Sequence, residues 1–264
     1  MKAKHLIILA ILGFNFTACN DEVEYIGLDE DLQSEFASST DEIREANQKE
    51  LDETGEISEE TLRNNEEKLM KAARELERNA KGDHGKLASI QREFFETLIA
   101  KNKPIQKQGE ALMRAIDFSN ADVRNNLDKG LLEIEKTKKI SQEYIDFVNV
   151  GMDETIVFLL DKYEVEGRAK EEFLRGMKSS LGGKKGDLIA VRQYDIDVCN
   201  EYARLINILK DKKDKWTWSE AKQNIEFTAD TEDATLDKVN AIYTKIQEIA
   251  LKQQAAERKM RGLK

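Results

Sequence analysis

Thiol and imidazole groups offer the most distinctive chemistry in this sequence, and there are few of them. The 264 residues contain two cysteines, Cys19 and Cys199, and two histidines, His5 and His84. A zinc site of the histidine and cysteine type needs three or four such ligands, and a nucleophilic cysteine needs a base within reach. We therefore expect no metal site and no cofactor, and we interpret Cys199 as an inert thiol that is buried or half-buried on a helix.

The other patterns that could support catalysis are equally weak. The glycine-rich segment 182–186 lacks the residue spacing of a phosphate-binding P-loop, and the Gly-x-Ser-x-Gly sequence of many hydrolases is absent. Carboxylates are so frequent that no pair stands out for acid–base work. We expect a chain without catalytic residues that is not an enzyme. Segment 182–186 is interpreted as a helix connection, and His84 as part of a surface loop at 82–85.

The residues before Cys19 distinguish it from Cys199. Lys2 and Lys4 give a basic start, and residues 6–16 form a short, mostly apolar stretch. A helix that spans a bilayer needs about 20 residues, so this stretch is too short for one. A basic segment followed by a short apolar segment is typical of a secretory signal peptide.

The closing residues Phe16-Thr17-Ala18-Cys19 resemble the signal of bacterial lipoproteins, in which a small residue precedes a cysteine; Phe16 stands where leucine is usual. The resemblance covers only the first 19 residues. It implies cleavage after Ala18, attachment of palmitate-type chains to Cys19, and a protein held on a membrane of the bacterial cell envelope, in our interpretation the outer membrane. The alternatives are an ordinary signal peptide or a buried apolar N-terminus.

Acidic residues dominate the segment that follows. Residues 20–67 contain 18 acidic and three basic side chains, whereas the whole chain has a net charge of −10. This imbalance argues against nucleic acid as a partner. The run Asn20-Asp21-Glu22-Val23-Glu24 resembles the surface-export signals of Bacteroidetes lipoproteins, and a solvated leash facing the periplasm is the competing interpretation. We expect a signal peptide at 1–18, the lipidated cysteine with a disordered acidic tether at 19–38, and a helical domain at 39–264.

Apolar residues recur every three or four positions along most of the remaining chain, which is typical of amphipathic helices. Ser39 and Glu42 have the spacing of an N-terminal capping box. Pro104 either kinks one helix or starts a new one. Polar residues also occupy positions within these stripes: Asp195 in the helix expected at 187–213, and Thr235 and Gln253 in the helix expected at 232–260. The expected helices cover 40–53, 58–80, 86–117, 120–163, 168–181, 187–213 and 232–260.

These narrow stripes on long helices predict an all-α fold, an elongated antiparallel helical bundle with packing like that of a coiled coil. No segment shows a convincing alternation of strand type, and the stretch from Trp216 to about residue 230 is expected to be irregular. No apolar run after the signal is long enough to span a membrane.

Four aromatic residues are candidates for contact with a ligand or a partner: Phe94, Phe95, Trp216 and Trp218. The alternative is that they complete the core. The run Gln91-Arg92-Glu93-Phe94-Phe95, together with the signal, faintly resembles uncharacterised helical lipoproteins of Gram-negative bacteria, a likeness too slight to imply a function.

The sequence favours a membrane-anchored envelope lipoprotein that is not an enzyme and that binds a protein partner or spaces it from the membrane. Its membrane contact is the lipid on Cys19. The alternative is a ligand-binding module that holds a small apolar molecule between its helices.

Overall fold

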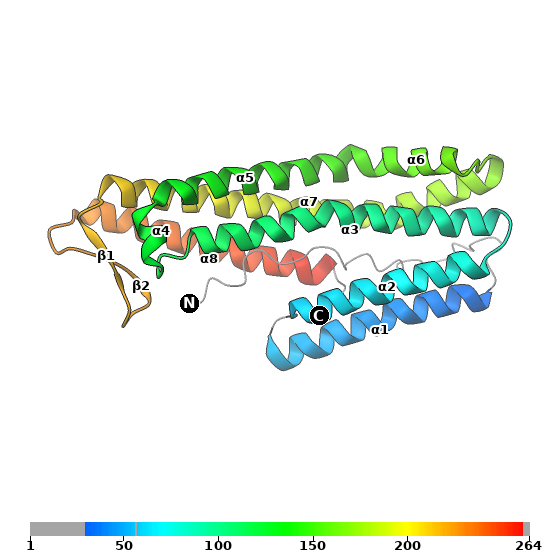
Figure 1. Cartoon of the computed structure of the whole chain (residues 1–264), viewed down its shortest axis with the longest axis horizontal. Helices are drawn as coiled ribbons and strands as arrows, with labels where there is room; N and C mark the ends of the chain where they lie inside the picture. Colours follow the sequence, from blue (N-terminus) through cyan, green and yellow to red (C-terminus); the bar gives the residue numbers. More distant parts are fainter. Residues whose placement is uncertain (1–29, 56, 261–264) are drawn as a thin grey trace. The chain divides into compact units, whose positions relative to one another are not determined.

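The computed structural model describes residues 30–55 and 57–260, and most of this part of the chain is helical (Figure 1). The predicted all-α class is confirmed, since the described strands form only one small hairpin. The elements are α1 (Glu30–Thr54), α2 (Glu59–Asn79), α3 (Asp83–Ala115), α4 (Ala121–Asn125), α5 (Leu127–Asp146), the π-helical turn η3 (Phe147–Gly151), α6 (Met152–Lys162), α7 (Gly167–Asp211), β1 (Trp216–Ser219), β2 (Asn224–Phe227) and α8 (Asp233–Met260).

The described residues form two compact units, and α3, α7 and α8 contribute to both. The first unit contains Lys103–Ile145 and Ala190–Ala255. The second contains the described residues up to Asn102, then Asp146–Ile189, and the end of α8 from Ala256.

In the first unit, α3, α5, α7 and α8 pack with alternating directions. The side-chain amide of Gln108 on α3 donates to Glu133 on α5 at 2.8 Å, and Lys210 on α7 donates to Asp128, near the start of α5. The β-hairpin then turns the chain, and α8 returns alongside α7. This part of the chain is an antiparallel four-helix arrangement of the kind expected for narrow apolar stripes.

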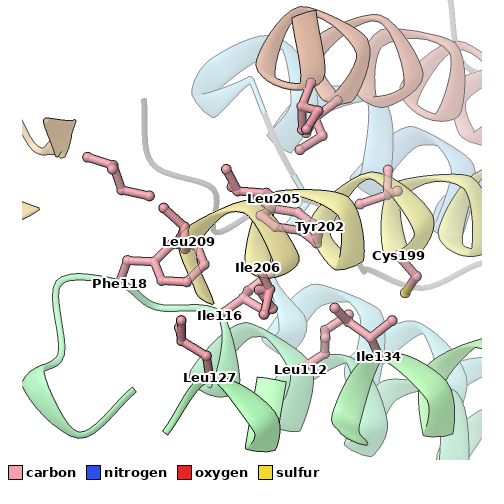
Figure 2. Packing of buried hydrophobic residues seen from close by; sticks show 14 of the residues in the cluster. Leu112, Ile116, Phe118, Leu127, Ile134, Cys199, Tyr202, Leu205, Ile206 and Leu209 are labelled. Atoms are coloured by element: carbon pink, nitrogen blue, oxygen red, sulfur yellow. The ribbon is translucent and has the colours of Figure 1, made fainter. Parts of the chain in front are cut away.

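The core of the first unit is built from these stripes (Figure 2). On α7, buried apolar residues follow one another at spacings of three and four, which places them on one helical face. Aliphatic and aromatic side chains from α3 and α5 pack against that face. The labelled members of the cluster are Leu112, Ile116, Phe118, Leu127, Ile134, Cys199, Tyr202, Leu205, Ile206 and Leu209.

The second unit begins with the antiparallel hairpin of α1 and α2. Ser58 caps α2 by accepting a hydrogen bond from the backbone N–H of Thr61, as its position before the apolar stripe suggests. The buried amide of Asn65 on α2 donates to Asn47 on α1 at 2.7 Å. The helix predicted over 58–80 is confirmed.

The first helix is longer than the sequence suggested. α1 begins at Glu30, so residues 30–38 of the predicted tether are helical, and Ser39 lies inside the helix instead of capping it. Neither glycine nor proline occurs between Glu30 and Thr54. Glu30 and Asp31 also suit the positive end of a helix dipole. The helix ends before Gly55, which has a φ of +79°.

The predicted break at 182–186 is also wrong, because α7 runs through it without interruption. The buried residues Leu181 and Leu188 are seven positions apart, so both lie on the same face of one helix. Burial of that face on both sides of the glycines offsets their cost of about 1 kcal/mol each relative to alanine.

Near α3, one expectation is wrong and one open alternative is decided. A loop was predicted at 82–85, but α3 already begins at Asp83. His84 is half-buried in the first turn of that helix. Of the two alternatives for Pro104, the continuous helix is the observed one, since the proline lies inside α3.

The helix predicted over 120–163 is present as consecutive pieces. Asn120 caps α4, and the backbone leaves helical geometry at Asn126, with φ −136° and ψ 66°. A π-helical turn from Phe147 to Gly151 then separates α5 from α6. Such a turn inserts one extra residue and shifts the phase of the helix.

The stretch after α7 forms a hairpin that the sequence analysis did not predict. β1 and β2 are antiparallel, with Trp216 opposite Phe227 and Trp218 opposite Ile225. Each strand is four residues long, so its alternation is too short to stand out from an irregular segment.

We predict that Gly183→Ala raises the free energy of unfolding by about 0.5–1 kcal/mol, because alanine favours a helix and a Cβ there meets nothing within 4 Å. Denaturant unfolding followed by circular dichroism measures the change. A lower stability would contradict the helix, because it would indicate a backbone conformation that alanine tolerates poorly.

Gly130→Ala is the matched control for this measurement. Its Cβ would lie 2.9 Å from Cδ1 of Ile206 and 3.2 Å from the carbonyl oxygen of Ala115, so we expect overpacking to lower stability by about 1–3 kcal/mol.

Candidate functional site

The predicted lipidation site lies outside the described residues. This applies to Ala18 and Cys19, and to the predicted signal peptide at 1–18. Among the helices that the structure describes, none combines the length and the apolar character needed to cross a membrane. Lipidation of Cys19 therefore stays a prediction.

Phe94 and Phe95 lie in the core of the second unit, where 0% and 1% of their surfaces are exposed. Rings so completely shielded cannot touch a protein partner in this conformation. The neighbouring residues Arg92 and Glu93 instead reach charged groups on adjacent helices. The run Gln91–Phe95 thus combines core packing with ion pairing.

Arg92 joins α3 to α2. Its Nε donates to Glu77 at 2.6 Å, and its Nη1 donates to Glu96 at 2.8 Å. Ser89 donates a further hydrogen bond to Glu77 at 2.8 Å. Burial opposes the ionisation of Glu77, but the bonds from Arg92 and Ser89 outweigh it and lower the pKa of that carboxyl. Arg92, Ser89, Glu77 and Glu96 thus have partners within one network, which suits a structural role.

Glu93 joins α3 to the end of α6. Lys162 donates to both of its oxygens at 2.7 and 2.8 Å, and the hydroxyl of Tyr163 donates at 2.5 Å. Partial burial raises the pKa of Glu93, whereas the hydrogen bonds from Lys162 and Tyr163 and the charges of Lys162 and Arg92 together lower it by more, so its pKa lies below the ordinary value of 4.5.

A carboxyl with a lowered pKa in the folded state stabilises the fold above its unfolded pKa, and this contribution is lost as the pH falls through the folded value. We predict that Glu93→Gln lowers the unfolding temperature at pH 7 and that this difference shrinks steadily below about pH 4.5. Thermal unfolding of both proteins across this range measures it. A difference that stays constant with pH would rule out the ionised carboxylate as the cause.

Trp216 and Trp218 belong to the hairpin in the first unit, so the four predicted aromatic residues are divided between the two units. The indole N–H of Trp216 donates to the carbonyl oxygen of Leu209 at 2.8 Å. Its ring meets Phe118 edge-on, with 6.5 Å between centroids. Trp218 packs half-buried against the same core cluster. Both indoles therefore cover the end of a helical core, which is the packing alternative that the sequence left open.

Three exposed apolar side chains gather on the segment from η3 to α6. They are Val150, Val157 and Phe158, with exposed fractions of 56%, 44% and 66%. Val150 lies in η3, and the other two lie seven and eight positions further along, in α6. None of them was predicted from the sequence. One signal could have found Phe158: it is apolar but lies next to Leu159, outside the buried stripe of the helix.

Cys199 is buried in the first unit with no exposed surface, as predicted. Burial raises the pKa of its thiol to about 12, and the nearby carboxylate of Asp195 acts in the same direction. Because the thiolate is the nucleophilic form, this cysteine is unsuited to catalysis near neutral pH. Among the described residues, no group of three or more histidine, cysteine or acidic side chains could hold a metal ion.

We predict that Cys199 in the folded chain resists iodoacetamide at pH 8 and reacts readily once the chain is unfolded in guanidinium, because its thiol is both shielded and protonated. Mass spectrometry of the peptide that contains Cys199 measures the modified fraction. Rapid modification without denaturant would show that the thiol reaches solvent.

A buried polar cluster lies in the first unit. Asp195 and Gln253, which the sequence places within apolar stripes, are 2% and 3% exposed. The amide of Gln253 on α8 donates to Asp195 at 2.8 Å, and Nη1 of Arg192 lies 2.9 Å from the other carboxylate oxygen. Arg192 was not singled out from the sequence, although it lies four positions after Leu188 and three before Asp195 and shares their buried face.

Burial dominates the pKa of Asp195 and raises it above the ordinary value. The charge of Arg192 and the hydrogen bond from Gln253 act in the opposite direction, and Ser141 on α5 also favours the ionised form. Tyr144, likewise on α5, is buried near the guanidinium, and its own pKa is raised by burial. The cluster thus joins α7 and α8 through the hydrogen bond from Gln253 to Asp195, with Ser141 and Tyr144 of α5 buried nearby.

No protein-family model matches the chain, and neither a curated protein nor a solved structure matches it. Functional inference therefore rests on the residues of the chain itself.

Proposed function

We propose that this chain is a lipid-anchored protein of the bacterial cell envelope, held on the outer membrane by acyl chains on Cys19, whose helical body binds a protein partner or spaces it from the membrane. The observation that carries the proposal is the basic and apolar segment that ends in Ala18-Cys19. Two or three acyl chains give stable anchoring at about 0.8 kcal/mol per buried methylene, whereas a single chain is marginal.

The distance from the anchor to the body has an upper bound. α1 begins at Glu30, eleven residues after Cys19. Eleven residues of fully extended chain reach at most about 40 Å, so α1 starts within that distance of the lipid attachment point. This reach supports a body that stands clear of the headgroups while staying near the membrane.

A role in protein interaction is supported by the exposed apolar residues Val150, Val157 and Phe158. A single exposed apolar side chain is ordinary on a protein surface. Three of them within nine residues place more apolar surface in one short segment of the chain. Contact with another protein would remove that area from water at roughly 25 cal/mol per Å².

Binding of a small apolar molecule is the alternative, and the packing gives it less support. Phe94 and Phe95 are enclosed in the core, and Trp216 uses its only donor on a backbone carbonyl. Native mass spectrometry of the purified protein separates the alternatives, because a retained small molecule would favour ligand binding.

Metabolic labelling with an alkyne analogue of palmitate tests the anchor. We predict that wild-type protein and Cys199→Ala are labelled and fractionate with membranes, and that Cys19→Ala is not labelled. Equal labelling of the wild type and Cys19→Ala would reject the anchor. Cys199→Ala is the matched control because it removes the only other thiol.

Photo-crosslinking in the native host tests the interaction role. A benzophenone amino acid at position 158 should capture a defined protein, and the same group at position 71 should not. The Lys71 side chain on α2 is 76% exposed, so this control shows whether capture requires the apolar residues or only exposure. Identical products at both positions would contradict a specific partner at α6.

A further inference from the structure

The buried guanidinium of Arg192 is only partly satisfied by the described residues. The side chain is 1% exposed, and Nη1 makes the ion pair with Asp195. The other two nitrogens, Nε and Nη2, are shielded and have no acceptor within hydrogen-bond distance. Oxygens of the same cluster also form no hydrogen bond, namely Oδ2 of Asp195, Oε1 of Gln253 and Oγ of Ser141.

Buried donors left without acceptors are costly, because each loses its hydrogen bonds to water on folding. Native proteins therefore satisfy nearly all buried polar groups, either with protein groups or with ordered water. Arg192 carries two such donors at one place.

The geometry of a guanidinium makes these two donors act together. The five N–H groups form a rigid planar fork, and the N–H groups of Nε and Nη2 point out along the same edge of that plane. An oxygen placed beside this edge can accept from both nitrogens at once, as carboxylate and phosphate oxygens do.

We propose that this edge of Arg192 is a binding site for internal water, in which at least one ordered water molecule accepts from Nε and Nη2. Water supplies the missing acceptor, and its own two donors suit a cluster that contains oxygens without a hydrogen bond. Buried waters of this type typically make about three hydrogen bonds to groups that would otherwise be unsatisfied.

Charge favours water over a small anion at the same edge. Arg192 and Asp195 together carry no net charge when both are ionised, so an added anion would bring an uncompensated charge into a buried site. The desolvation of an unpaired ion costs several kcal/mol, and neutral water avoids this cost.

Internal water can be counted by the magnetic relaxation dispersion of water ¹⁷O and ²H nuclei, with the full chain as the sample. We expect the wild type to show at least one more long-lived internal water than Arg192→Met/Asp195→Leu. The control is Arg204→Met/Glu201→Leu. It removes a pair of the same i, i+3 type from the same helix, but its arginine is 60% exposed, so the count should not change.

Arg192→Met/Asp195→Asn covers the case in which the first double variant does not fold. Asparagine keeps an acceptor for Gln253, and methionine has no N–H donor, so the count should again fall by at least one. An unchanged count in either folded variant would overturn the proposal. A wild-type stability that rises with acetate or chloride at constant ionic strength, but not in a folded double variant, would also overturn it in favour of a bound anion.

Discussion

The burial of apolar stripes against antiparallel neighbours is the constraint on which this structure depends. Each long helix carries one narrow stripe, and the stripe is covered only if another helix runs alongside it for many turns. Residues such as Leu205 and Ile206 on α7, with no exposed surface, show how completely this is achieved in the first unit. Full burial of such a side chain contributes about 1.5–3 kcal/mol. That burial outweighs the helix-breaking tendency of glycine within α7 and of proline within α3.

Polar residues inside these stripes have a different role. A buried ion pair is weak support for stability, because desolvation of the two charges offsets much of their attraction. The hydrogen bond from Gln253 to Asp195 nevertheless joins α8 to α7, and Arg192 forms an ion pair with the same carboxylate. The buried pair Asn47 and Asn65 does the same for α1 and α2. Apolar contacts tolerate small shifts along a helix, whereas these hydrogen bonds do not.

Sequence periodicity predicted the helical class and the helices that have strong stripes, such as α2 and α8, because burial and period are directly linked. Prediction from periodicity failed where the local composition of a segment and its tertiary packing favour different structures. The segment 182–186 has the composition of a loop, yet burial of Leu181 and Leu188 keeps it helical. The hairpin at Trp216 was missed because four-residue strands carry little periodic signal. Asp195 and Gln253 fell within the predicted stripes but were not singled out as site residues. Their cluster with Arg192, and the exposure of Phe158, become evident only once their surroundings are known.

The proposed function combines a covalent lipid anchor with a helical body that has exposed apolar side chains. Its central claim is the covalent lipid on Cys19, since attachment to a membrane and the spacing of a partner from it both depend on that bond. The most direct measurement is mass spectrometry of the N-terminal peptide from protein isolated from membranes of the native host. The account predicts a peptide that begins at Cys19 and carries at least two acyl chains. A mature N-terminus elsewhere, with an unmodified Cys19, would contradict it.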